Sequence, residues 1–155
     1  MNGRMAITSG DMTSTHSEAK YAPGTRVVVE HATYGTREYV YVKNGSGASI
    51  AASLGVMIKS GSSDHTVALS GANIARARLI GVTHVAIADG YYGWVIARGA
   101  GVTVTDSGSG ISANDSLKCG ANGTFATGTA LTEETVGFTG AAITASATGV
   151  VFLKL

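Results

Sequence analysis

The feature that most restricts the fold of this chain is a succession of short Val, Ile and Thr runs, separated by Gly, Ser and Asn. From Gly90 to Leu155 such runs follow one another at a spacing of about 8–12 residues, which is typical of strands in small β-domains. β-Branched residues favour strands, and Gly and Asn supply the backbone conformations of tight turns. The pattern therefore predicts an all-β fold, a sandwich or barrel-like domain of short antiparallel strands.

The same pattern can be followed along the rest of the chain. Asp89-Gly90 is a strong hairpin signal, because both residues tolerate the positive φ that a tight turn requires. Residues 48–54 are expected to form one helical turn or an irregular segment, and residues 73–78 a helix too short to be stable alone. The strands that we expect lie at residues 26–30, 36–43, 55–59, 65–69, 78–88, 92–98, 101–105, 116–119, 123–126, 136–138 and 149–155.

Composition indicates one domain with a real core. The chain has 155 residues, of which 45% are hydrophobic and only 14% are charged, against a usual charged fraction of about a quarter. So few charges suggest that partners cover part of the surface, since exposed β-surface of low charge tends to aggregate. Residues 1–20 form a polar arm, expected to be extended, that either frays or becomes ordered on a neighbouring subunit. Residues 21–155 form the β-rich domain.

Charge and cysteine usage argue against several classes of function. The net charge is +1 and the densest basic pair is Arg76 and Arg78, so we expect no direct binding of nucleic acid. No apolar run is long enough to span a membrane as a helix, and the N-terminus lacks the apolar core of a secretory signal. The expectation from these residues is a soluble protein made in a cytoplasm. The single cysteine, Cys119, cannot form an intrachain disulfide.

The residues that could form a catalytic, nucleotide-binding or metal-binding site lack the spacing that such sites require. Ser63-Asp64-His65 has the residue types of a hydrolytic triad, but neighbours on an extended chain point to opposite faces. Residues 108–113 match Gly-x-Gly-x-x-Ala, yet no helix follows to receive a pyrophosphate. Glu133-Glu134 and Cys119 have no identified partner, and His84 lies in an apolar run. We therefore expect no catalytic residue, no cofactor and no metal site.

The aromatic residues are the candidates for a binding interface. Strand periodicity places Tyr92 and Trp94 on one face of residues 92–98 and Tyr91 on the other, and it places Tyr39 and Tyr41 together on one face of residues 36–43. One interpretation is core packing, with a neighbouring ring at the surface. The other is an interface, because Trp and Tyr dominate binding hot spots. The candidate interface residues are Tyr91, Tyr92, Trp94, Tyr39 and Tyr41.

Residues 79–155 also carry a resemblance to a known family. The segments concerned are Gly81-Val82-Thr83-His84-Val85-Ala86, Tyr92-Gly93-Trp94-Val95, Val102-Thr103-Val104, Asn114-Asp115-Ser116-Leu117, Gly123-Thr124-Phe125 and the apolar closing residues 136–155. Residues 34–42 fit more loosely. In these segments the chain resembles the decoration, or cement, proteins of tailed-bacteriophage capsids.

The resemblance implies a β-rich structural protein without catalytic residues. Such a protein would be made in the cytoplasm of a bacterial host and bind the major capsid protein on the outer surface of the virion. It would associate with itself as a dimer or trimer and brace neighbouring capsomers. Repeated modest contacts around a symmetric shell would add up through multivalency, and an edge strand such as residues 26–30 could pair across subunits.

Two other functions remain open from the sequence. The chain could be a phage fibre, tail or cell-surface β-module that binds carbohydrate through a stacking platform of Tyr91, Tyr92, Trp94 and Asp89. A small hydrolase using His84, or Ser63, Asp64 and His65, is the third possibility.

Overall fold

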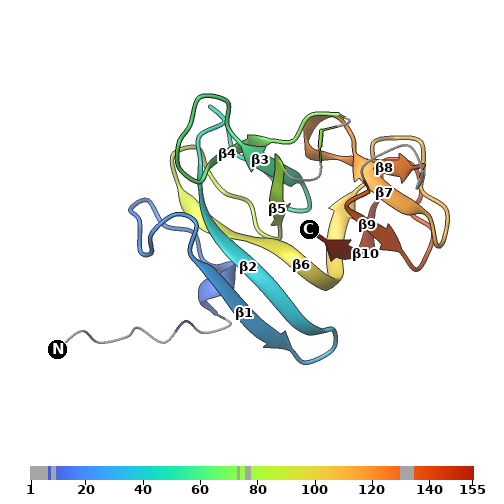
Figure 1. The fold of residues 1–155 in the computed structure, drawn as a ribbon, viewed down its shortest axis with the longest axis horizontal. Helices are drawn as coiled ribbons and strands as arrows, with labels where there is room; N and C mark the ends of the chain where they lie inside the picture. Colours follow the sequence, from blue (N-terminus) through green and yellow to red (C-terminus); the bar gives the residue numbers. More distant parts are fainter. Residues whose placement is uncertain (1–6, 8–9, 73, 76–77, 130–134) are drawn as a thin grey trace.

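The computed structural model of the chain describes residues 7, 10–72, 74–75, 78–129 and 135–155 (Figure 1). Within these residues the regular structure is almost entirely strand, which confirms the all-β class. Two short 3-10 turns accompany the strands, η1 (Asp11–Thr13) and η3 (Ala121–Gly123). The strands are β1 (Arg26–His31), β2 (Gly35–Asn44), β3 (Gly55–Ile58), β4 (Thr66–Leu69), β5 (Leu79–Thr83), β6 (Tyr92–Thr105), β7 (Ser116–Cys119), β8 (Phe125–Gly128), β9 (Gly137–Thr139) and β10 (Thr148–Lys154).

These ten strands form one curved sheet in the order β1-β2-β4-β3-β5-β6-β10-β9-β7-β8. β2 pairs additionally with β6, so the pairings that run from β2 through β4, β3, β5 and β6 return to β2. The β2–β4 pair is parallel, and the other strand pairs are antiparallel. β1 and β8 stand at the two ends of the sheet, which is therefore not closed into a barrel.

The two central strands, β2 and β6, are buried on both faces. Tyr39 and Tyr41 of β2 pack with Trp94 of β6 in one hydrophobic cluster, while Val40 and Val42 belong to a second cluster on the opposite face. The alternation predicted for residues 36–43 is thus present in the structure. Because both faces of β2 are covered, the face that carries Tyr39 and Tyr41 also belongs to the core.

The strand expected over residues 78–88 is shorter in the structure, because its second half leaves the sheet. β5 ends at Thr83, whose hydroxyl donates a hydrogen bond to Ala51 O at 2.7 Å. Further along, the side chain of Asn44 donates to Ile87 O at 2.8 Å, and Gly90 N donates to Asn44 O at 2.8 Å. The Asp89-Gly90 turn therefore belongs to a wide connection fixed by a buried asparagine, and not to a two-residue hairpin.

β6 is one bent strand where the sequence predicts two. Its first half pairs with β2 and its second half pairs with β10. The bend lies between Gly99 and Gly101, which have φ values of +133° and +70° and so adopt a conformation that other residues rarely do. Figure 1 shows β6 passing beneath β2 and then turning toward β10. The bend lets one strand belong to both halves of the sheet.

The described part of the expected N-terminal arm packs against its own domain. Met12 of η1 is buried in the core, and His16 forms an isolated bridge with Tyr92 of β6. Residues 1–6 and 8–9 of the arm lie outside the described residues, as do residues 73, 76 and 77 of the short helix expected at 73–78. No helix within the described ranges is long and apolar enough to cross a membrane.

Candidate binding surface

The bend in β6 is held by one arginine of β2. Arg37 is only 8% exposed, and its Nε donates to Ala100 O at 2.9 Å while Nη2 donates to Gly101 O at 2.5 Å. The guanidinium lies 5.0 Å from the ring centre of Tyr34, which packs over it at the β1–β2 turn. A planar group with several N–H donors can satisfy two adjacent carbonyls that point the same way. Arg37 therefore fixes the shape of β6 at this point.

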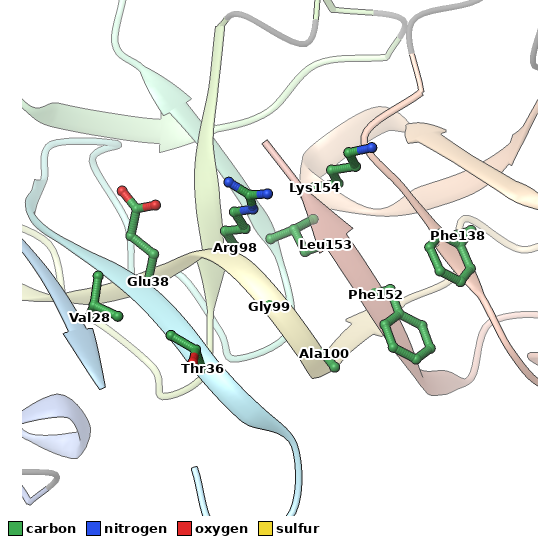
Figure 2. A pocket seen from close by; sticks show the side chains of 10 residues that line it. All are labelled: Val28, Thr36, Glu38, Arg98, Gly99, Ala100, Phe138, Phe152, Leu153 and Lys154. Atoms are coloured by element: carbon green, nitrogen blue, oxygen red, sulfur yellow. The ribbon is translucent and has the colours of Figure 1, made fainter. Parts of the chain in front are cut away.

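A groove of about 500 Å³ lies along the bend (Figure 2). Figure 2 shows β1 and β2 side chains on one side, the backbone of β6 between, and β9 and β10 side chains on the other. Charged groups from Glu38, Arg98 and Lys154 stand among an otherwise largely apolar lining. The lining residues are Val28, Thr36, Glu38, Arg98, Gly99, Ala100, Phe138, Phe152, Leu153 and Lys154.

A stacked pair of phenylalanines forms the most apolar part of this groove. Phe138 of β9 and Phe152 of β10 are cross-strand neighbours, with ring centres 4.7 Å apart and planes inclined by only 9°. They are 45% and 44% exposed, and Val28 on the opposite side is 68% exposed. Large apolar side chains gathered in a concave surface mark a binding site more strongly than the same side chains scattered singly. We therefore take this groove as the candidate binding surface.

The aromatic residues singled out from the sequence lie elsewhere, and three of them are in the core. Trp94 and Tyr41 are completely buried opposite each other in the β2–β6 register, and Tyr39 is also buried. Tyr92 is half-buried and stacks on Tyr41, while Tyr91 is 40% exposed. In the folded chain Trp94 and Tyr41 offer no surface to a partner, and Tyr39, which is 7% exposed, offers very little. The interface prediction stays open only for Tyr91 and Tyr92.

Sequence reasoning missed Phe138 and Phe152 because β10 carries apolar residues on both faces. Val151 and Leu153 are buried, whereas Val150 and Phe152 alternate with them and are exposed. An unbroken apolar run does not reveal which face meets the core. The exposed Lys154, two residues after Phe152, was the available signal, because side chains two apart in a strand share a face.

The loop that matches Gly-x-Gly-x-x-Ala is organised around a carboxylate. Asp106 is buried, and its Oδ2 accepts hydrogen bonds from Gly108 N at 2.7 Å, Gly110 N at 3.0 Å and Ser146 N at 3.0 Å. A phosphate would need the N–H groups that Asp106 already occupies, and the two negative charges would repel each other. The motif is therefore a structural turn.

The other candidate chemical groups are engaged in packing or turns. Burial raises the pKa of the Cys119 thiol to about 11, and burial lowers the pKa of His84, which packs edge-on against Tyr39 with ring centres 5.6 Å apart. Hydrogen bonds from the side chain and backbone of Thr66 lower the pKa of Asp64. Within the described part of the chain, no three His, Cys, Asp or Glu side chains cluster closely enough to hold a metal ion. Glu133 and Glu134 both lie outside the described residues, which do not include residues 130–134.

Comparison with known proteins identifies a fold and no sequence family. No family model and no curated protein matches the sequence. Among solved structures, the chain is similar to the N base of the head fiber gp8.5 of bacteriophage phi29, with a TM-score of 0.58 and 15% sequence identity. The match covers 75% of this chain and 94% of that chain. The likeness therefore includes nearly all of the phage domain and shows that the two share a fold.

Proposed function

We propose that this chain is a structural protein of a tailed-phage head and attaches to the outer surface of the capsid. The observation that carries the proposal is the shared fold with a head-fiber base over 94% of that chain. The resemblance of residues 79–155 to capsid decoration proteins points to the same location from the sequence alone. In this role the chain has no catalytic activity.

In the more specific form of the proposal, the chain is a decoration protein that braces neighbouring capsomers through the groove. Two exposed phenylalanines and Val28 provide apolar area, and burying such a side chain contributes about 1.5–3 kcal/mol at full burial. Glu38, Arg98 and Lys154 give the surface both signs of charge, which favours one orientation of the partner. Contacts of this size are modest singly, and repetition over a shell multiplies their effect.

A second candidate function is that of a fibre base, and the likeness to a head-fiber base favours it. Such a base would occupy the capsid in the same way but would carry a further element instead of bracing the shell. The carbohydrate-binding form of this alternative is less well supported. Its stacking platform needs Trp94, which is completely buried, and Asp89 is engaged by Gly47 N at 2.9 Å.

The test is co-sedimentation of the purified chain with expanded capsids that lack it, prepared from the phage whose genome encodes it. We expect saturable binding at a fixed ratio. Phe152→Ser should weaken it at least about tenfold, since loss of an aromatic hot spot costs about 2 kcal/mol or more and tenfold corresponds to about 1.4 kcal/mol. Tyr91→Ser is the matched control, because Tyr91 and Phe152 are 40% and 44% exposed but only Phe152 lines the groove.

The outcomes separate the alternatives. Capsids that become more resistant to heat on binding support bracing, whereas binding without added resistance supports the fibre base. If the Tyr91 variant loses binding and the Phe152 variant does not, the interface predicted from the sequence is right and the groove is not the contact. No binding by a folded chain contradicts the capsid role.

A further inference from the structure

β1 presents an unpaired edge. It stands at the end of the sheet, and among the described residues it pairs on one side only, with β2. Val28 at its centre is 68% exposed, more than any other large hydrophobic side chain described. Figure 1 shows β1 at the margin of the molecule, in front of η1. An open edge with an exposed apolar centre is a template for another strand.

The backbone groups available on that edge can be identified from the β1–β2 register. Tyr41 N donates to Thr25 O at 2.9 Å, so the carbonyl of Thr25 points toward β2, while Thr25 N donates to Ala22 O. Hydrogen-bonded and non-hydrogen-bonded pairs alternate along antiparallel strands, so Val27 and Val29 direct their backbone groups toward β2. Arg26, Val28 and Glu30 then direct their N–H and C=O groups toward the open edge.

The side chains of those three residues form a self-complementary pattern. Arg26, Val28 and Glu30 are all exposed and share one face of β1, while Val27 and Val29 pack against the core. The order is therefore positive, apolar, negative. A strand with this order fits a second copy of itself running in the opposite direction, because each charge then meets its opposite. A parallel copy in the same register would set like charges side by side.

We propose that two copies of this chain pair through β1, antiparallel, about a two-fold axis at Val28. Val28 faces Val28 of the second copy in a hydrogen-bonded pair, and Arg26 of each copy faces Glu30 of the other. The same three residues supply the outward backbone groups and the complementary charges, so geometry and electrostatics select one register. The two curved sheets become one continuous sheet across the axis.

The contact is small, and this sets its strength. One short edge strand buries much less than the roughly 1,600 Å² of a standard stable interface. We therefore expect a dissociation constant in the micromolar range in free solution. Copies held side by side on a surface would pair more readily, because tethering raises their effective concentration. The pairing is a property of the free chain and does not depend on the proposed capsid attachment.

The test is sedimentation equilibrium of the purified full chain, without capsids, from about 1 to 500 µM, a range that brackets micromolar affinity. Glu30→Arg should weaken the dimer at least about tenfold, because the two-fold axis sets two pairs of like charges opposite each other. Among the described residues Glu30 has no ion pair within its own chain, whereas Arg26 has one with Glu38 at 2.5 Å. Glu18→Arg, off the strand, is the control of equal charge change.

A mixing experiment removes the ambiguity of folding. Arg26→Glu alone should weaken the dimer to a similar degree. An equimolar mixture of the Arg26→Glu and Glu30→Arg variants should form heterodimers, because every facing pair is again of opposite sign. Neither a misfolded variant nor a contact elsewhere on the chain predicts this recovery. Circular dichroism of each variant alone verifies the fold.

Three results would overturn the proposal. The wild-type chain could remain monomeric throughout the range, which would leave the β1 edge to a different partner. The dimer could be equally sensitive to Glu18→Arg and Glu30→Arg. The mixture could stay monomeric although both variants are folded. None of these results bears on capsid binding, which is measured separately.

Discussion

Replacing Arg37 by alanine should destabilise the chain strongly, because the side chain is only 8% exposed and bonds two backbone carbonyls. The change removes the donors for Ala100 O and Gly101 O. A hydrogen bond from a charged donor contributes about 1.5–3 kcal/mol, and water can replace part of the loss once the side chain is gone. We therefore expect a loss of about 2–4 kcal/mol in the free energy of unfolding. For a chain of this size that lowers Tm by about 5–15 °C.

The matched control for this prediction is Arg26→Ala. Arg26 forms an ion pair with Glu38 at 2.5 Å, but its side chain is 56% exposed, so the pair should contribute about 0–1 kcal/mol. Arg37→Lys keeps the charge, but the ammonium group cannot bond both carbonyls in one plane. Its loss of unfolding free energy should therefore lie between those of Arg37→Ala and Arg26→Ala. Thermal unfolding followed by circular dichroism measures all three. Equal, small shifts for Arg37→Ala and Arg26→Ala would refute the view that Arg37 holds the bend.

Three further predictions concern other described residues. Gly101→Ala should lower the free energy of unfolding more than Gly35→Ala. Both glycines have φ +70°, but only at Gly101 would the new methyl group meet the Tyr34 ring. Equal losses in urea titrations would contradict this. Burial raises the pKa of Asp106, but hydrogen bonds from the backbone of Gly110, Ser146 and Gly108 outweigh it and leave the pKa below the ordinary value. The carboxylate therefore stabilises the fold above the unfolded-state pKa of about 3.9, and this stabilisation is lost as pH falls through the lower folded-state pKa. Asp106→Asn should be less stable than wild type at pH 7, and a gap that did not narrow in acid would count against the assignment. Cys119, with a pKa of about 11, should resist a thiol reagent at pH 8 until the chain is unfolded; fast labelling of the native chain would show that it is accessible.

Local pattern was sufficient for the parts of the fold that depend on near neighbours. The alternation from Glu38 to Lys43 predicts both faces of β2, and the runs at residues 26–30, 55–59 and 65–69 predict β1, β3 and β4 to within a residue or so. The resemblance pointed to phage head proteins, and the fold is shared with one. Each of these inferences uses either residues that are close in sequence or the residue pattern of a long segment.

The candidate binding surface could not be predicted in the same way, because it depends on how distant segments meet. From the sequence alone Trp94 could belong to the core or to an interface, and only the β2–β6 register places Tyr41 directly opposite it. Phe138 and Phe152 become a stacked pair only through the β9–β10 pairing. The groove lies along the bend in β6, where Arg37 of β2 donates to Ala100 O and Gly101 O. None of these contacts has a signature in the local sequence.

The bend in β6 also affects how the two halves of the sheet unfold. One 14-residue strand is paired with β2 in its first half and with β10 in its second, so neither half of the sheet can detach without exposing backbone amides of the same strand. Such a shared element couples the two halves into one cooperative unit. The amide protons of β6 should then exchange with deuterium only when the whole chain unfolds, at the same slow rate on both sides of Gly99. Heating should therefore unfold both halves of the sheet in a single transition, and not in stages.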